Sequence, residues 1–103
     1  MKNYELMIIM VPDLDKSVYS SFFEKVETDI ASHDGKLEGW QFWSENRRLS
    51  YMIQSKSANR AKFNQGTYVL ANFLLSAESL KRVKYLFDLE DNVLRYMIVK
   101  KGE

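Results

Sequence analysis

Residues 3–11 read NYELMIIMV, and this segment constrains the fold more than any other part of the chain. Alternate side chains of an extended strand point to opposite faces, and beyond Glu5 both faces of this strand are apolar. Such a strand is stable in the interior of a sheet, where neighbouring strands and covering layers keep water away. The segment therefore predicts a central strand near the start of the chain.

The next segment changes from a two-residue period to the spacing of a helix. Residues 16–33 place apolar side chains three and four positions apart, so one stripe of the predicted helix faces a core. Asp13 or Asp15 can cap its N-terminus, because a carboxylate accepts hydrogen bonds from the first free N–H groups. Gly35 predicts its end, since glycine readily takes a positive φ.

The second half of the chain returns to strands and adds one more helix. Residues 36–53 are too long for one flat strand, so we expect a bend or bulge around Gly39 or over residues 44–46. Ser76 is suited to cap the second helix. The later segments are a polar, basic connection, a strand, a helix and a last strand, over residues 54–65, 67–75, 77–87 and 93–100.

This order of elements, β-α-β-β-α-β, predicts an α+β, ferredoxin-like fold. Two right-handed crossovers place the first and third strands in the middle of a four-stranded antiparallel sheet, in the spatial order four-one-three-two. Both helices then cover one face of the sheet. We expect a single domain over residues 1–103, because the length suits one core and no linker or repeat interrupts the chain.

The other face of this sheet is predicted to lack a helical cover and yet to be apolar. The residues assigned to the helix-covered core are Leu6, Ile8, Leu49, Val69, Phe73, Tyr96 and Ile98. Alternation then leaves six large side chains on the open face: Met7, Ile9, Tyr68, Leu70, Met97 and Val99. Exposed apolar patches usually mark binding surfaces, so we assign this one to a partner protein. A hairpin that shields the face, or the opposite face assignment, would remove that surface.

The net charge of +1 hides a positive segment and a negative one. Between Asn46 and Gly66 the chain has five cations and no acid, whereas between Asp13 and Glu38 it has seven acids and three cations. From composition alone a solvated loop is the favoured interpretation of the cationic segment, and phosphate binding is the alternative. The candidate RNA contacts are the segment's Arg47, Arg48, Lys56, Arg60 and Lys62, together with Lys2 and Arg95 from outside it.

Adjacent residues of a strand point to opposite faces. We therefore expect one of Arg47 and Arg48 to meet phosphate and the other to brace the sheet, an acid or the partner protein. We expect Lys2 to lie closer to Arg95 than to Lys100. Five aromatic residues are candidates for stacking on unpaired bases: Tyr4, Trp40, Phe42, Trp43 and Tyr68. An aromatic residue in a strand is more often part of the core, so we expect most of the five to be core residues, with Trp40 and Tyr68 as the exceptions.

Several classes of function are disfavoured by what the sequence lacks. It has no cysteine, so disulfides, thiolate catalysis and sulfur-ligated metals are excluded. His33 is the single histidine, placed where a cation would favour a helix C-terminus. No phosphate loop, nucleophile elbow or metal-ligand cluster is present. We expect neither an enzyme nor a small-molecule substrate, cofactor, metal or membrane span.

Several segments, taken in order, resemble the bacterial small-subunit ribosomal protein number six family. The resemblance covers nearly the whole chain, about residues 1–101. Its residues are Tyr4-Glu5, Trp43, Arg47-Arg48-Leu49-Ser50-Tyr51-Met52-Ile53, Gly66 with Tyr68, and the final strand Val93-Leu94-Arg95-Tyr96-Met97-Ile98-Val99-Lys100. The departures are Ser44 for glycine, Ser50 for alanine, Met52 for proline, and a longer connection over 54–65.

The resemblance implies a non-enzymatic, structural constituent of the small ribosomal subunit in the bacterial cytoplasm. It implies binding to the central domain of small-subunit rRNA, as a heterodimer with ribosomal protein eighteen. A second hypothesis is a ferredoxin-like dimerising or ligand-sensing module that uses the open sheet face for self-association.

Overall fold

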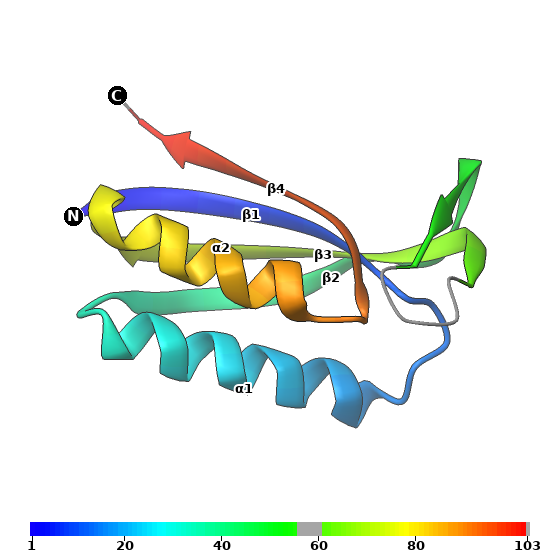
Figure 1. Ribbon diagram of the computed structural model, residues 1–103, viewed down its shortest axis with the longest axis horizontal. Helices are drawn as coiled ribbons and strands as arrows, with labels where there is room; N and C mark the ends of the chain where they lie inside the picture. Colours follow the sequence, from blue (N-terminus) through cyan, green and yellow to red (C-terminus); the bar gives the residue numbers. More distant parts are fainter. Residues whose placement is uncertain (56–60, 103) are drawn as a thin grey trace.

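A computed structural model of the chain describes residues 1–55 and 61–102 (Figure 1). The elements in chain order are β1 (Lys2–Met10), α1 (Lys16–Ser32), β2 (Lys36–Gln54), β3 (Lys62–Leu75), the short 3-10 helix η1 (Ala77–Ser79), α2 (Leu80–Leu89) and β4 (Val93–Lys101). This order confirms the predicted β-α-β-β-α-β arrangement.

The four strands form one sheet in the order β2-β3-β1-β4, with every neighbouring pair antiparallel. Both helices lie on the same side of this sheet (Figure 1). The central strand β1 is the apolar segment predicted from residues 3–11, and its Leu6 and Ile8 are completely buried. The predicted fold and strand order are therefore confirmed.

The N-terminus of α1 is capped by one of the two predicted residues, whereas the turn at its C-terminus uses a different residue from the predicted one. Asp15 is the N-cap, because its Oδ1 accepts a hydrogen bond from the Ser17 N–H at 3.2 Å. At the other end Asp34, with φ 64°, takes the left-handed conformation that was predicted for Gly35. Gly35 is required for space instead, since an added Cβ would collide with the carbonyl oxygen of Leu74.

The core lies between the sheet and the helices and is rich in aromatic side chains. Phe23 of α1 stacks on Trp40 of β2, with ring centroids 4.5 Å apart and planes 11° from parallel. Tyr96 and Ile98 pack against this core as predicted. Leu49 does not pack against it, and its side chain lies beside Gly66 instead, so that assignment was wrong.

The β2–β3 hairpin is longer than the sequence pattern predicts. Residues 54–65 were expected to form an irregular connection, but β3 begins at Lys62 and pairs with the end of β2 through Ile53 and Phe63. The register against β3 shifts after Leu37, twice between Phe42 and Arg47, and again before Ile53. The predicted irregularities near Gly39 and over residues 44–46 are therefore present.

Candidate nucleic-acid interface

The β2–β3 hairpin extends past the helices, at the right of Figure 1, and carries exposed cations. Arg47, Arg48 and Lys62 are all exposed. The ion pairs found among residues 1–55 and 61–102 involve other side chains. The positive charge of these three residues is therefore available to an external anion. Lys56 and Arg60, predicted to extend the same surface, lie outside the described residues.

Arg47 lies over two aromatic rings rather than against an acid. Its Cζ is 5.8 Å from the ring centroid of Trp43 and 5.8 Å from that of Tyr68. The two rings meet edge to face, with centroids 5.6 Å apart and planes at 74°. We call these three residues the aromatic–arginine cluster. Of the two adjacent arginines, Arg47 is the one that lies against rings of the sheet, and which of the two meets phosphate stays a prediction.

A bulge in β2 leads into Arg47. The register against β3 shifts between Phe42 and Ser44 and again between Ser44 and Arg47, which adds residues to β2 alone. Asn46 sits within the second shift at φ 49°. Its backbone N–H donates to Thr67 Oγ1 at 3.2 Å, and Thr67 Oγ1 donates to Asn46 Oδ1 at 3.3 Å. These bonds fix the bulge to the central part of the sheet.

A second bulge exposes two apolar side chains that sequence reasoning missed. Between the pairs Arg48–Gln65 and Ile53–Phe63 the chain advances five residues along β2 but two along β3. Tyr51 and Met52, inside this bulge, are each 57% exposed, while Ile53 is completely buried. The run from Arg47 to Ile53 alternates regularly, so its sequence gave no sign of the bulge.

Lys2 and Arg95 lie at opposite ends of the sheet, which contradicts the predicted proximity. In the β1–β4 register Tyr4 pairs with Lys100, and Ile9 pairs with Arg95. The start of one strand meets the end of its antiparallel neighbour, so Lys2 lies beside the C-terminal lysines and away from the hairpin. Arg95 is level with Tyr68, because Ile9 pairs with both residues.

The six apolar residues predicted for the open face do share one face of the sheet. Met7 pairs with Leu70 on one side and with Met97 on the other. Met97 is 56% exposed and Val99 is 47% exposed, and the other four are half-buried. A depression of about 150 Å³ opens on this face, lined by Met7, Ile9, Arg95, Tyr96 and Met97. This surface is apolar at its centre and has an arginine at one side.

The aromatic candidates divide between the core and the surface. Tyr4 is buried against Phe73, and Trp40 is stacked in the core, so neither is free to stack on a base. The preference for Trp40 was therefore wrong. Trp43 is 53% exposed and Tyr68 is half-buried, which leaves these two on the surface.

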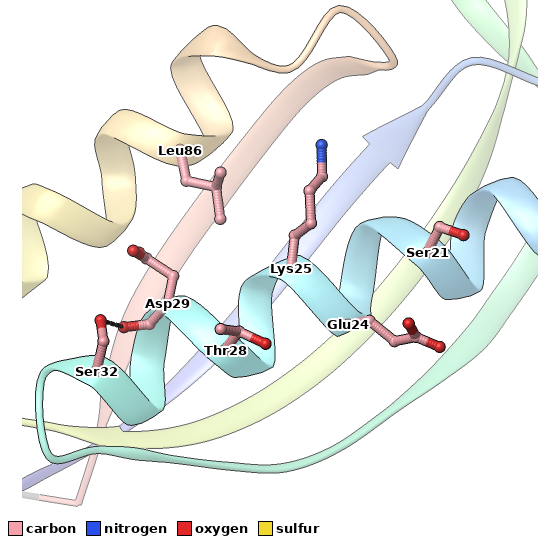
Figure 2. Close-up of a pocket in the computed structure, with 7 residues that line it drawn as sticks. All are labelled: Ser21, Glu24, Lys25, Thr28, Asp29, Ser32 and Leu86. Carbon is pink, nitrogen blue, oxygen red and sulfur yellow. Dashed lines mark hydrogen bonds between the residues drawn. The ribbon is translucent and has the colours of Figure 1, made fainter.

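A groove of about 720 Å³ lies between the helices (Figure 2). One side of α1 supplies its lining, apart from Leu86 of α2. Lys25, which lines it, is paired with Glu90 at 3.2 Å, and Ser32 Oγ donates to the backbone carbonyl of Asp29 at 2.6 Å. The charged side chains of this groove therefore make contacts along the helix surface and do not converge on a reacting centre.

The single histidine makes a hydrogen bond at the C-terminal end of α1. His33 Nδ1 lies 2.8 Å from the carbonyl oxygen of Asp29, so the ring nitrogen donates to it. Among the residues that the structure describes, no group of three or more histidine, cysteine or acidic side chains is placed to hold a metal ion. Within the same residues, no helix has the length and apolar character needed to cross a membrane.

Comparison with known proteins decides the family. Residues 3–100 match the family described as ribosomal protein S6. The small ribosomal subunit protein bS6 of Clostridium perfringens is 32% identical over 103 residues, which cover 100% of both chains. The chain belongs to the ribosomal protein S6 family. The protein of the same name from Clostridioides difficile is 33% identical over 96% of this chain and 98% of that protein.

Solved structures agree with this membership at the level of the fold. The crystal structure of 30S ribosomal protein S6 from Thermotoga maritima has a TM-score of 0.75 at 19% identity, covering 97% of this chain and 87% of that one. The C-terminal domain of the MgtC protein from Mycobacterium tuberculosis has a TM-score of 0.62 at 16% identity, covering 100% and 89%. Because the fold also occurs in a protein of another name, the ribosomal assignment rests on sequence.

Membership of the ribosomal protein S6 family confirms the resemblance seen in the sequence. It also makes this chain an RNA-associated protein of the small ribosomal subunit, working in the cytoplasm where ribosomes translate.

Proposed function

We propose that the chain is a structural, non-catalytic constituent of the small ribosomal subunit that binds the central domain of its rRNA together with ribosomal protein eighteen. The observation that carries this proposal is the exposed hairpin with Arg47 and Arg48 next to an apolar sheet face without a helical cover. One surface suits phosphate and the other suits a protein, so a single small domain can join the two.

The cationic surface is assigned to rRNA. Arginine and lysine side chains that neutralise phosphates release condensed counterions, and this release supplies much of the affinity. Arg48 and Lys62 are exposed, and Arg95 is exposed on the open face at the level of Tyr68. Lys2 lies at the far end of the sheet, so it would meet a different stretch of rRNA from the hairpin.

The apolar surface is assigned to ribosomal protein eighteen. Met7, Leu70 and Met97 form a row across the three strands β3, β1 and β4. A row of large apolar side chains in water costs free energy that docking of a protein recovers. The depression beside Met97 provides a place for an apolar anchor of the partner, the kind of contact that dominates interface energies.

Binding to the isolated central domain of small-subunit rRNA tests this function. We expect weak binding by the chain alone, because its net charge is only +1, and tighter binding when ribosomal protein eighteen is present. The complex should weaken steeply as salt rises. Equal and negligible binding with and without the partner protein, at low salt, would rule the proposal out.

A second function is favoured by one observation, the apolar face of the sheet, where Met97 is 56% exposed and Val99 is 47% exposed. The apolar sheet face could then pair with a second copy of this chain, as in a dimerising or ligand-sensing module. Analytical ultracentrifugation separates the two. A stable self-dimer that ignores rRNA supports the module, whereas a monomer that binds rRNA with its partner supports the ribosomal role.

A further inference from the structure

We propose that Trp43, Tyr68 and Arg47 form a stacking site for one unpaired RNA base. This inference rests on the proposed function and deepens it, because it names the feature of RNA that the hairpin recognises. Charged contacts to phosphate carry little sequence or shape information, whereas a ring that stacks on a base requires that base to be outside a helix.

The first argument is the exposure of Trp43. The other tryptophan of β2, Trp40, is stacked on Phe23 in the core. The packing of the core therefore does not require Trp43. Trp43 remains 53% exposed on the open face, in contact with Tyr68. A half-exposed indole costs hydrophobic free energy in the free protein, and a stacked base would cover it.

The second argument is the position of Arg47. Its guanidinium carbon lies 5.8 Å from each of the two ring centroids, within the range of cation–π attraction. A guanidinium beside aromatic rings can stack on a base itself while its N–H groups reach phosphate oxygens. The cluster therefore combines a π surface with a cation, as nucleic-acid stacking sites do.

The third argument is that the cluster is held in place before binding. The bulge that precedes Arg47 is fixed by hydrogen bonds between Asn46 and Thr67. Glu45 pairs with Lys16 at 3.4 Å, so the acid closest to Arg47 in sequence is engaged elsewhere. Preorganisation lowers the entropy cost of ordering side chains on binding.

Charge around the cluster favours RNA over a protein as its occupant. Arg47 itself is cationic, and Lys62 lies further along the same hairpin, where it pairs with Gln54. No acid occurs between Asn46 and Gly66. The centre of the apolar face, around Met7 and Leu70, lacks these cations and is the better place for a protein. Tyr68 lies at the border between the two surfaces.

Oligonucleotide binding by full-length variants tests the site. The probes are a short unpaired oligonucleotide and a duplex of the same length, each carrying a fluorescent label, and protein is titrated in at low salt with the anisotropy of the label as readout. Trp43→Leu removes the ring and Trp43→Phe keeps one, while Tyr85→Leu removes an exposed ring from α2, on the helix side of the sheet. Thermal unfolding confirms that each variant is folded.

We expect Trp43→Leu to lose about tenfold in affinity for the unpaired probe and little for the duplex. Its slope of log affinity against log salt should match that of the wild type, because no charge is removed. Trp43→Phe should retain most of the affinity, and Tyr85→Leu all of it. Equal losses on both probes, or no loss on the unpaired probe, would overturn the stacking site.

The same variants on central-domain rRNA with ribosomal protein eighteen separate this inference from the proposed function. Tight binding by the wild type and weaker binding by Trp43→Leu supports both. Equal binding by the two proteins overturns the stacking site and leaves the ribosomal role intact. An absence of binding by the wild type overturns the ribosomal role, and with it the stacking site.

Discussion

The side-chain carbonyl oxygen of Asn46 accepts a hydrogen bond from the backbone N–H of Asp13 at 2.9 Å. This bond joins the bulge in β2 to the loop between β1 and α1, 33 positions earlier in the chain. The same oxygen accepts from Thr67, so one amide links three segments of the molecule. The position of the aromatic–arginine cluster therefore depends on a residue that touches neither ring.

Replacing Asn46 by alanine should loosen the bulge. Loss of its hydrogen bonds should lower the free energy of unfolding by about 1–3 kcal/mol, as measured by urea denaturation. Asn46→Asp, which keeps an acceptor oxygen in place, should retain more of the stability. The Trp43 emission of Asn46→Ala should also shift toward that of a solvated indole. Unchanged stability and emission would show that the bulge is held by other contacts.

Removing both hairpin arginines should flatten the salt dependence of rRNA binding. For Arg47→Ala with Arg48→Ala we expect the slope of log affinity against log salt to fall by about 0.7–0.9 for each arginine that meets a phosphate. Lys81→Ala with Arg82→Ala is the matched control, because it removes two adjacent exposed cations from α2. An unchanged slope in the first variant would exclude both arginines from the interface.

A carboxylate at the centre of the open face should impair partner docking more than folding. Met7→Glu or Leu70→Glu places a charge in the apolar row that crosses β3, β1 and β4. We expect at least a tenfold loss in affinity for ribosomal protein eighteen with a cooperative unfolding transition retained. Tyr85→Glu on α2 should leave docking unchanged. A Met7→Glu chain that no longer folds would show that this face is interior.

Two glycines give opposite expectations for the same substitution. At Gly35 a Cβ would collide with the Leu74 carbonyl oxygen and with the Ile30 side chain, so Gly35→Ala should destabilise the fold by about 1–3 kcal/mol. At Gly39 no heavy atom lies within 4 Å of the added Cβ, so Gly39→Ala should be neutral or slightly stabilising. Urea denaturation of the two variants tests the contrast, and equal effects would contradict it.

Alkaline pH should reduce stability through Tyr96. Burial, together with the hydrogen bond its hydroxyl donates to Asp88 at 2.8 Å and the charge of that carboxylate, raises the pKa of Tyr96 from 10.0 to about 12. The folded state therefore holds this proton more tightly than the unfolded state does. The contribution of the Tyr96 proton to the free energy of unfolding is complete below about pH 10 and declines as pH rises toward 12.

Tyr96→Phe removes that titrating group and tests the sign of the effect. Its free energy of unfolding should fall less than that of the wild type over the alkaline range, as measured by urea midpoints at a series of pH values. Absorbance of tyrosinate should show one late-titrating tyrosine in the wild type that the variant lacks. Parallel pH profiles for the two proteins would contradict the assignment.

Much of the fold follows from periodicity, because burial on one or two faces leaves a direct trace in sequence. The apolar character of residues 3–11 predicted the central place of β1, and alternation placed Met7 and Leu70 on one face. Antiparallel pairing of β1 with β4 also places Lys2 near Lys100. The prediction placed Lys2 nearer Arg95, and it was wrong. Applying the register rule strand by strand gives the observed arrangement.

The details of the candidate site depend on register shifts that alternation does not reveal. Trp40 and Trp43 differ by three positions in an irregular strand, and bulges decide which of them enters the core. Asp34 rather than Gly35 adopts the positive φ because the space beside the Leu74 carbonyl excludes a side chain from position 35. Such outcomes depend on contacts between segments distant in sequence.

The pairing of β1 with β4 has a consequence for biosynthesis. β1 is translated before β4, yet its register joins Asn3 to Lys101, which lie almost the full length of the domain apart in sequence. At the usual rate of elongation the apolar strand waits roughly ten seconds for its second neighbour. A nascent chain that stalls before Val93 leaves β1 as an unpaired edge strand. We expect such a chain to be bound by chaperones or degraded by proteases rather than assembled.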